Sequence, residues 1–141
     1  MSLQTTLILF KPDAISKGLC GAALTRFEAA ALKIRGIRML TFEDSLLREH
    51  YAHIASKPFF PEVARFMQST PIIALALSGP DAVQKVRDLL GPTDSTKAAK
   101  GTIRGDLGKD VMANVCHASD SAEAAATEVK RFFPQDAQFD Y

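Results

Sequence analysis

The chain has 141 residues, 47% hydrophobic and 23% charged, and its 17 Lys+Arg against 16 Asp+Glu give a formal net charge of +1 at pH 7. These values are typical of one globular domain, expected to span residues 1–141, and the near-neutral charge argues against a protein that holds nucleic acid by bulk electrostatic attraction. The two cysteines, Cys20 and Cys116, have no metal-ligand spacing, so neither a zinc site nor a disulfide scaffold is expected.

The beginning of the chain shows no targeting signal. It lacks a basic segment, and the apolar run from Leu7 to Phe10 is stopped by Lys11-Pro12-Asp13, which makes it too short for a signal peptide. No stretch approaches the roughly 18 apolar residues of a membrane span. We therefore expect a cytoplasmic protein without a membrane partner.

The first half of the chain predicts a strand, a helix, a second strand and two short helices. Residues 7–10 form an apolar run typical of a buried strand. Apolar residues at helical spacing over 20–34 predict a helix that Gly36 ends. Alternation over 37–42 predicts a strand, and residues 44–55 and 63–67 have helical patterns.

The second half begins with a continuous apolar run over 71–77, which favours a strand covered on both faces. Gly79-Pro80-Asp81 predicts the start of a helix, with Pro80 at an early helical position. The segment 91–115 has no clear period, and a loop of that length inside a compact domain is usually functional. Residues 114–117 then predict a short fourth strand.

The last helix is expected to start at Asp120 as its N-cap, with Glu123 completing a capping box. Its buried stripe is expected to comprise Ala122, Ala126, Val129 and Phe133. The complete order is βαββαβ with extra helical pieces. This order predicts an α+β, ferredoxin-like fold, with a four-stranded antiparallel sheet covered by helices.

His117 is the strongest candidate for chemistry, because it lies at a predicted strand end just before a helix. Glu128 lies two turns into that helix, on a flank that could face the imidazole. A carboxylate there could accept the proton of one ring nitrogen and leave the other free as a nucleophile. Cys116 should point to the opposite face of the strand and belong to the core. The alternative for His117 is a purely structural role, in the core or beside a helix cap.

Three cations, Lys11, Arg87 and Arg104, lie near ends of predicted elements and could converge on one cleft. Polyphosphate binding without a P-loop needs such cations, because arginine matches pairs of phosphate oxygens. No GxxxxGK[ST] motif occurs, which excludes a Walker-type kinase. Each cation taken alone could also be an ordinary surface charge.

Tyr51 and the pair Phe59-Phe60 are the informative aromatic residues. Adjacent residues cannot easily both face the core, so one phenylalanine could remain on the surface as a platform for stacking a base. The alternative is that Phe59 and Phe60 both belong to the core, in an irregular turn.

Together these motifs make the chain resemble the nucleoside diphosphate kinase family along almost its whole length. The matching segments, in chain order, are Lys11-Pro12-Asp13, Arg26-Phe27-Glu28, Tyr51 with Lys57-Pro58-Phe59-Phe60, Arg87-Asp88-Leu89-Leu90-Gly91 with Thr93, Gly101-Thr102-Ile103-Arg104-Gly105-Asp106, and Asn114 with His117-Ala118-Ser119-Asp120-Ser121. Any one segment is weak, but their joint order and spacing are specific.

The resemblance implies a phosphotransferase that moves the γ-phosphate of a nucleoside triphosphate, typically ATP, to a nucleoside diphosphate and so maintains nucleoside triphosphate pools. The transfer would be ping-pong, through a phosphohistidine on His117. Glu128 and Ser119 would orient the imidazole, and Tyr51 would line the reacting site.

The resemblance also implies a nucleotide site. Lys11 and Asn114 would contact the sugar hydroxyls, with Lys11 also near the phosphates. Arg87, Thr93 and Arg104 would hold the distal phosphates.

Phe59 would stack on the base, with Val111 on its other side. Because every base offers a π-face, broad nucleotide specificity follows. Mg²⁺ would arrive with the nucleotide, held by phosphates and water and not by direct protein ligands.

Family members are usually homo-oligomers, and a hexamer is favoured here over a tetramer. Ala118 departs from the family's usual glycine, and its methyl group would narrow the approach of a phosphate and disfavour a positive φ.

Two other classes of function fit the same predicted topology. RNA-recognition domains carry exposed aromatic residues on their central strands, whereas residues 7–10 and 72–77 are nearly aliphatic, so no specific nucleic acid partner is expected. A regulatory domain that binds a small molecule without chemistry would leave His117 and Arg104 unexplained.

Overall fold

The computed structural model describes residues 3–141 and contains a four-stranded sheet in the order β2-β3-β1-β4, with every neighbouring pair antiparallel. The strands are β1 (Leu3–Phe10), β2 (Lys33–Leu40), β3 (Ile72–Pro80) and β4 (Cys116–Ala118). The predicted α+β fold of ferredoxin-like topology is confirmed. In the described chain, no helix is both long and apolar enough to cross a membrane.

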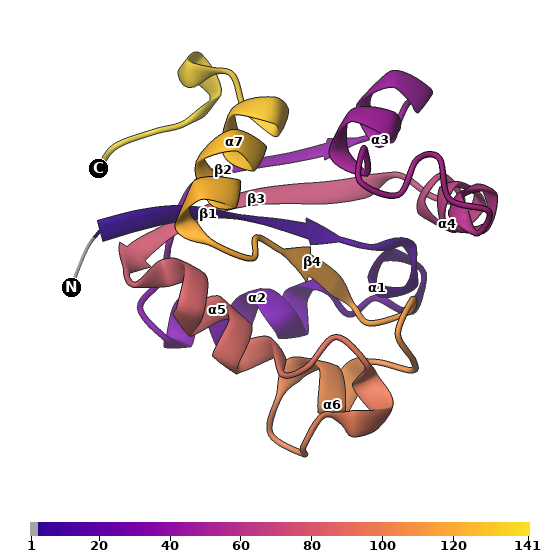
Figure 1. Ribbon diagram of the computed structural model, residues 1–141. Coiled ribbons are helices and arrows are strands. Elements are labelled where there is room, and N and C mark those ends of the chain that lie inside the picture. Colours follow the sequence, from indigo (N-terminus) through magenta and orange to yellow (C-terminus); the bar gives the residue numbers. More distant parts are fainter. Residues whose placement is uncertain (1–2) are drawn as a thin grey trace.

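Helices cover both faces of the sheet (Figure 1). One face carries α1 (Pro12–Lys17), α2 (Cys20–Ala29), α5 (Ala82–Leu90) and α6 (Ile103–Leu107). The other face carries α3 (Asp44–His50), α4 (Phe60–Met67) and α7 (Ala122–Phe132). Two short 3-10 turns, η1 (Ser95–Lys97) and η2 (Gln135–Ala137), complete the described elements.

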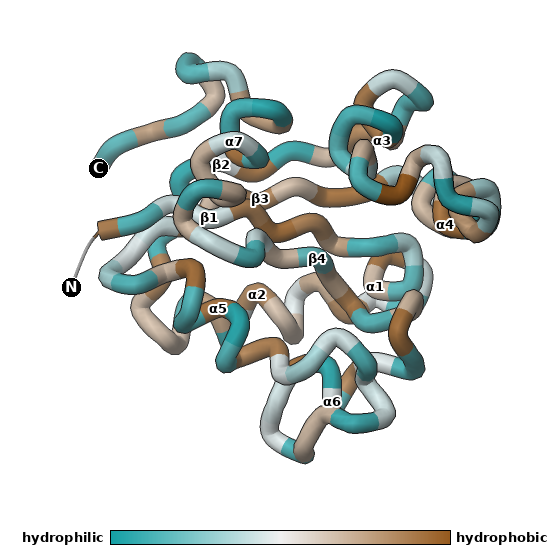
Figure 2. Tube along the Cα trace, viewed as in Figure 1, coloured by the Kyte–Doolittle hydropathy of each residue, from teal (hydrophilic) through white to brown (hydrophobic). Residues whose placement is uncertain are grey.

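The central strands β1 and β3 alternate between two apolar cores. Ile8 and Leu75 point to the face of α2 and α5, whereas Leu7 and Ala74 point to the face of α7. Figure 2 shows hydrophobic residues along these strands and mainly hydrophilic ones on the outer helical turns. Burial on both faces explains why the strand sequences are continuously apolar and do not alternate.

The edge strand β4 is three residues long and pairs with the central strand β1, where His117 lies opposite Leu9. The residues on either side of His117, Cys116 and Ala118, are buried in the core beneath α5. Because strand side chains alternate, His117 points away from that core and towards the face of α7. The strand therefore fixes the direction of the His117 side chain.

The predicted helix over 20–34 is too long at its C-terminal end. Helix α2 stops at Ala29, Ala31 turns the chain with φ 65°, and Ile34 already belongs to β2. No glycine marks this turn, so the sequence carried no stop signal there. Gly36 lies inside β2, where a Cβ atom would come within 2.9 Å of the Ala137 carbonyl oxygen, so it allows the C-terminal segment to approach the strand.

Two predicted helix starts were also wrong. Pro80 is the last residue of β3, and helix α5 begins only after Asp81. Ser121, not Asp120, caps α7, because its hydroxyl accepts the Ala124 amide hydrogen at 3.1 Å. The carboxylate of Asp120 instead forms an ion pair with a side chain of α5, as described below.

The expected helix over 44–55 is regular only to His50, after which the chain continues in turns. In α7 the buried face contains Ala125, Val129 and Phe132, while Ala122 and Ala126 are exposed. The expected stripe was therefore partly out of phase.

The strand predicted over 37–42 is observed as β2, which spans Lys33–Leu40, and two of its apolar side chains, Ile37 and Met39, are 57% and 59% exposed. Strand β2 is an edge strand, and none of the described helices covers these two residues. They form an uncovered apolar patch at the sheet edge.

Replacing Gly36 with alanine is expected to destabilise the fold by roughly 1–3 kcal/mol, the usual cost of overpacking. The added methyl group would meet the Ala137 carbonyl at 2.9 Å and the Phe133 ring at 3.0 Å. Urea unfolding measures the effect.

Gly21→Ala in α2 is the matched control. Nothing lies within 4 Å of a Cβ there, so it should stabilise the helix by roughly 0.5–1 kcal/mol. Equal effects of the two changes would contradict this packing.

Candidate active site

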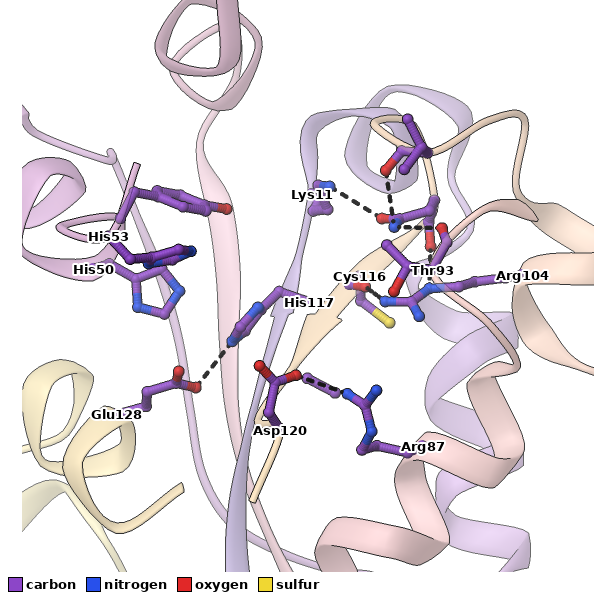
Figure 3. Close-up of a pocket in the computed structure, with 14 residues that line it drawn as sticks. Lys11, His50, His53, Arg87, Thr93, Arg104, Cys116, His117, Asp120 and Glu128 are labelled. Carbon is purple, nitrogen blue, oxygen red and sulfur yellow. Dashed lines mark hydrogen bonds and ion pairs between the residues drawn. The ribbon is translucent and has the colours of Figure 1, made fainter. Parts of the chain in front are cut away.

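A cavity of about 290 Å³ opens at the end of β4 and gathers residues from most of the chain. Its wall contains all three histidines of the sequence (Figure 3). The lining residues predicted from the sequence are Lys11, Tyr51, Arg87, Thr93, Arg104, Val111, Asn114, His117 and Glu128. The expected convergence of the three cations on one cleft is therefore observed.

His117 is held by a carboxylate on the following helix. Its Nε2 lies 2.9 Å from Glu128 Oε1, and the Ser119 hydroxyl donates to the same oxygen at 2.8 Å. Burial alone would raise the pKa of Glu128, but the hydrogen bonds from His117 and Ser119 lower it overall. An ionised carboxylate only accepts hydrogen bonds, so Nε2 carries the proton and Nδ1 of the neutral ring has a free lone pair.

Ser119 does not line the cavity but connects the carboxylate to the sheet. Its side chain is fully buried, and its oxygen accepts the Leu7 amide hydrogen at 3.3 Å. Glu128 is thereby tied to the backbone of β1 through one hydroxyl. This link restricts the carboxylate that orients the imidazole.

Lys11 and Asn114 form a buried pair across the cavity floor. The Lys11 Nζ donates to Asn114 Oδ1 at 3.0 Å, and the Asn114 amide donates to the carbonyls of Thr93 and Val111 at 3.0 and 3.2 Å. Burial lowers the pKa of Lys11 to about 8, with Asp13 opposing the shift and Arg104 adding to it. Asn114 thus fixes both the ammonium and the loop segment beside it.

Arg104 is 6% exposed and holds the long loop against β4. It donates to the carbonyls of Asn114, Gly91 and Cys116 at 3.2, 3.2 and 2.7 Å. Burial lowers its pKa from the ordinary value, yet arginine remains charged at any physiological pH. Three of its five N–H groups are used in these bonds, which leaves two for a ligand.

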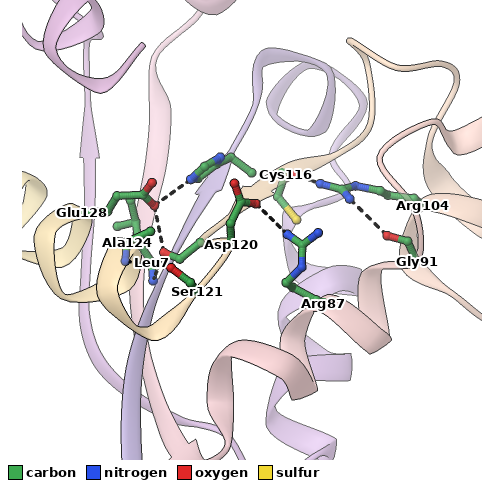
Figure 4. Close-up of polar contacts among 11 residues, drawn as sticks. Leu7, Arg87, Gly91, Arg104, Cys116, Asp120, Ser121, Ala124 and Glu128 are labelled. Atoms are coloured by element: carbon green, nitrogen blue, oxygen red, sulfur yellow. Dashed lines mark hydrogen bonds and ion pairs between the residues drawn. The ribbon is translucent and has the colours of Figure 1, made fainter. Parts of the chain in front are cut away.

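Arg87 reaches the cavity from α5 and pairs with Asp120 at 2.9 Å (Figure 4). The side chains are 37% and 82% exposed, so the pair is worth little as a stabilising contact. Its geometry nevertheless places the guanidinium at the cavity mouth.

The wall opposite the cations is aromatic and contains two residues that sequence reasoning missed, His50 and His53. The rings of His50 and His117 meet edge to face, 4.7 Å between centroids and 81° apart. Burial raises the pKa of Tyr51 to about 12, and the charge of Glu128 adds to the shift, so its hydroxyl remains a hydrogen-bond donor. The only available signal was the small number of histidines in the chain.

Phe59 is the one predicted ligand-contacting residue that does not line the cavity. It is 51% exposed, while its neighbour Phe60 is buried, as the pairing argument expected. Val111, on the cavity wall, is 59% exposed. Both side chains offer apolar surface without a packing role in the core.

The backbone around His117 accommodates Ala118 without strain. The positive φ values of non-glycine residues in residues 3–141 fall at Ala31, Asp81 and Val115, so position 118 does not require glycine. Val115, with φ 78°, is instead the strained residue. Its amide donates to Asp13 Oδ2 at 2.9 Å, and its carbonyl accepts the Lys11 amide hydrogen at 3.0 Å. These bonds hold a conformation that costs about 1–3 kcal/mol.

Comparison with known proteins agrees with this geometry. A sequence model of the family described as nucleoside diphosphate kinase matches residues 4–138. The chain belongs to the nucleoside diphosphate kinase family.

Individual relatives match over nearly their whole length. The nucleoside diphosphate kinase of Parabacteroides distasonis is 45% identical over 99% of this chain and 91% of its own. That of Saccharomyces cerevisiae is 43% identical over 100% and 94%. The solved structure of the Halobacterium salinarum enzyme in complex with CDP is 39% identical, with a TM-score of 0.95 over 99% of this chain and 93% of that one.

Membership in the nucleoside diphosphate kinase family makes the chain a phosphotransferase that acts on nucleotides. The resemblance inferred from the motifs is therefore confirmed at the level of family and activity.

The described residues offer one cluster of potential metal ligands, namely His50, His117 and Glu128, with ligand atoms within 4.8 Å of one another. Glu128 in this cluster already accepts a hydrogen bond from His117, and the Arg131 guanidinium lies 2.9 Å from His50 Nδ1. The other carboxylate at the cavity, Asp120, is paired with Arg87. The donor set therefore suits an anionic ligand better than a bare cation.

Nucleotide binding is expected to weaken as the pH rises through about 8. Lys11 is charged below its pKa of about 8 and neutral above it, so it attracts phosphate only on the acidic side. The KM for a nucleoside diphosphate, measured against pH, should rise on the alkaline side. In Lys11→Gln the KM should be higher throughout and should lack this rise. An alkaline rise of the same size in Lys11→Gln would show that another group is responsible.

Proposed function

We propose that the chain transfers the γ-phosphate of a nucleoside triphosphate, typically ATP, to a nucleoside diphosphate by a ping-pong reaction through a phosphohistidine on His117. The single observation that supports this most strongly is the Nε2–H of His117 bonded to Glu128 at 2.9 Å. This bond leaves Nδ1 unprotonated on a ring that lines a cavity with three cations. A neutral imidazole so oriented is a competent nucleophile near neutral pH.

In the first half-reaction Nδ1 attacks the γ-phosphorus, and a new N–P bond forms. The bond between the γ-phosphorus and its bridging oxygen breaks, and the leaving diphosphate keeps the electron pair. In the second half-reaction a terminal oxygen of the acceptor diphosphate attacks the phosphorus and the N–P bond breaks. His117 keeps its Nε2–H throughout, donated to Glu128, and Ser119 holds that carboxylate in place.

The cations would position and neutralise the phosphates. Phosphoryl transfer through a loose transition state depends mainly on alignment and on the stabilisation of oxygen charge. Arg87 and Arg104 would bind distal phosphate oxygens together with Thr93. Lys11 would serve both the phosphates and the sugar, with Asn114 on the sugar hydroxyls.

Tyr51 would donate its hydroxyl at the reacting centre, because its raised pKa keeps it protonated. Phe59 and Val111 would enclose the base, a role supported by their exposure of 51% and 59% without a place in the core. Stacking accepts purines and pyrimidines alike. Broad base specificity follows from these contacts.

Mg²⁺ is proposed as the cofactor, carried in by the nucleotide. The cavity fits such a complex, since its cations would meet phosphate oxygens while its two carboxylates are already hydrogen-bonded. When bound, the ion would withdraw negative charge from the transferring phosphate.

A homo-oligomer, a hexamer rather than a tetramer, is proposed for the assembly. The support within the chain is the edge strand β2, with Ile37 and Met39 exposed on it. An uncovered apolar edge favours pairing with a second copy. We also propose that the protein is located in the cytoplasm and that residues 1–141 form a single domain.

Phosphate labelling tests the nucleophile directly. With ATP carrying a labelled γ-phosphate and Mg²⁺, the protein should take up label that is acid-labile and base-stable, and a nucleoside diphosphate should discharge it. In His117→Ala, label and activity should both disappear, because the attacking nitrogen is gone. Removing Mg²⁺ with EDTA should slow the uptake.

Binding of nucleotide by His117→Ala, measured by calorimetry, is the control for the integrity of the site. Persistent base-stable label in His117→Ala, or no label in the natural protein, would show that the proposed intermediate is wrong.

Met39→Glu tests the assembly, because a buried charge at a pairing edge is costly. Light scattering should show a smaller particle than for the natural chain. Ala126→Glu adds the same charge on an exposed position of α7 and should leave the particle unchanged. An unchanged mass in Met39→Glu would exclude this edge as the interface.

A further inference from the structure

His50 packs against the nucleophile but has no role in the transfer proposed above. It is 6% exposed, and its ring meets the rings of His117, Tyr51 and Phe132 edge to face, with centroids 4.7, 5.0 and 5.2 Å away. Figure 3 shows it beside Glu128, on the side of the cavity opposite Arg104. His50 therefore forms the surface against which the His117 imidazole rests.

The orientation of His50 is set from α7. The Arg131 Nη1 lies 2.9 Å from His50 Nδ1, and since a guanidinium only donates, Nδ1 is the acceptor. A neutral His50 must then carry its proton on Nε2. Arg131 is fixed in turn by its Nε, which donates to Glu49 Oε2 at 2.8 Å. Arg131 thus selects both the tautomer and the direction of the ring.

The surroundings keep His50 neutral. Burial lowers its pKa to about 3, and the neighbouring His117, Arg131 and His53 lower it further, while Glu128 opposes the shift. Glu49 and Tyr51 are the other titratable neighbours, on the same helix and at its end. A neutral ring here places no positive charge beside the nucleophile, where a cation would compete for Glu128.

We propose that Arg131 is a positioning residue for the reaction, acting through His50. Its hydrogen bond to Nδ1 fixes His50 as the Nε2–H tautomer and holds the ring in its edge-to-face contact with His117. The braced His117 ring keeps Nε2 on Glu128 and Nδ1 towards the incoming phosphorus. This inference rests on the proposed role of His117 as the nucleophile.

Loss of Arg131 would have two consequences for the site. The His50 ring could exchange tautomers or rotate, so that the His117 imidazole would lose its rigid neighbour. Without the adjacent guanidinium the pKa of His50 would also rise, because the charge of Arg131 is one of the causes that lower it. The acid limb of the rate profile should then begin at a higher pH.

The test uses Arg131→Met, which keeps the length and apolar stem of the side chain but removes the donor. Two-bond ¹H–¹⁵N correlation on the labelled, full-length protein reports the His50 tautomer, and steady-state kinetics across pH reports kcat and KM. In the natural protein His50 should be the pure Nε2–H tautomer. In Arg131→Met the Nδ1–H form should appear. We expect kcat to fall on the order of tenfold, the lower end of the loss seen when a residue that orients a metal-bound histidine is removed. The nucleotide KM should not change.

Lys130→Met is the matched control, because it removes the same charge from the neighbouring exposed position of α7 and should leave the tautomer and kcat unchanged. Arg131→Lys keeps a donor and should restore part of the rate. A natural tautomer and pH profile in Arg131→Met, or an equal loss of kcat in Lys130→Met, would overturn the inference. If the natural protein carries phosphate label on His117 but the Arg131 variants behave as just described, only the positioning role of Arg131 is wrong and the proposed function stands. Absence of that label would overturn both.

Discussion

The hydrogen bond from His117 Nε2 to Glu128 is the constraint on which the rest of the site depends. It decides which imidazole nitrogen is protonated and therefore which one carries a lone pair. The bond has support on both sides. Ser119 holds the carboxylate and is itself bonded to the Leu7 amide of β1, while His50 packs against the imidazole ring. An orientation that would be mobile in an isolated side chain is thus determined by the sheet and by α7 together.

The cations of the cavity are likewise held before a ligand arrives. Arg104 spends three donors on backbone carbonyls of the long loop and β4, and Lys11 is bonded to Asn114. These bonds offset part of the cost of burying charge. They also mean that little side-chain freedom remains to be lost when a phosphate binds, which favours affinity.

The sequence predicted the fold class and most elements, because the continuous apolar run over 71–77 and the helical spacing of apolar residues in α5 are both visible within a short window. It also predicted that His117 lies at a strand end with Glu128 on the following helix, and that the three cations could converge on one cleft, since local patterns identify the elements that carry them. Errors occurred where the deciding partner is distant in the chain. Gly36 looked like a helix stop because the C-terminal segment that packs on it was not visible. His50 was missed because its importance comes from Arg131, 81 residues away.

The pairing of His117 with Leu9 links the loss of activity on heating to the unfolding of the sheet. His117 lies on an edge strand of three residues, but that strand pairs with β1, one of the two central strands, which is covered by both cores. Fraying of β4 would break its pairing with Ile8, Leu9 and Phe10 of β1, all of which are buried. Heat inactivation and global denaturation should therefore coincide as a single cooperative event, with no inactive but folded stage preceding them.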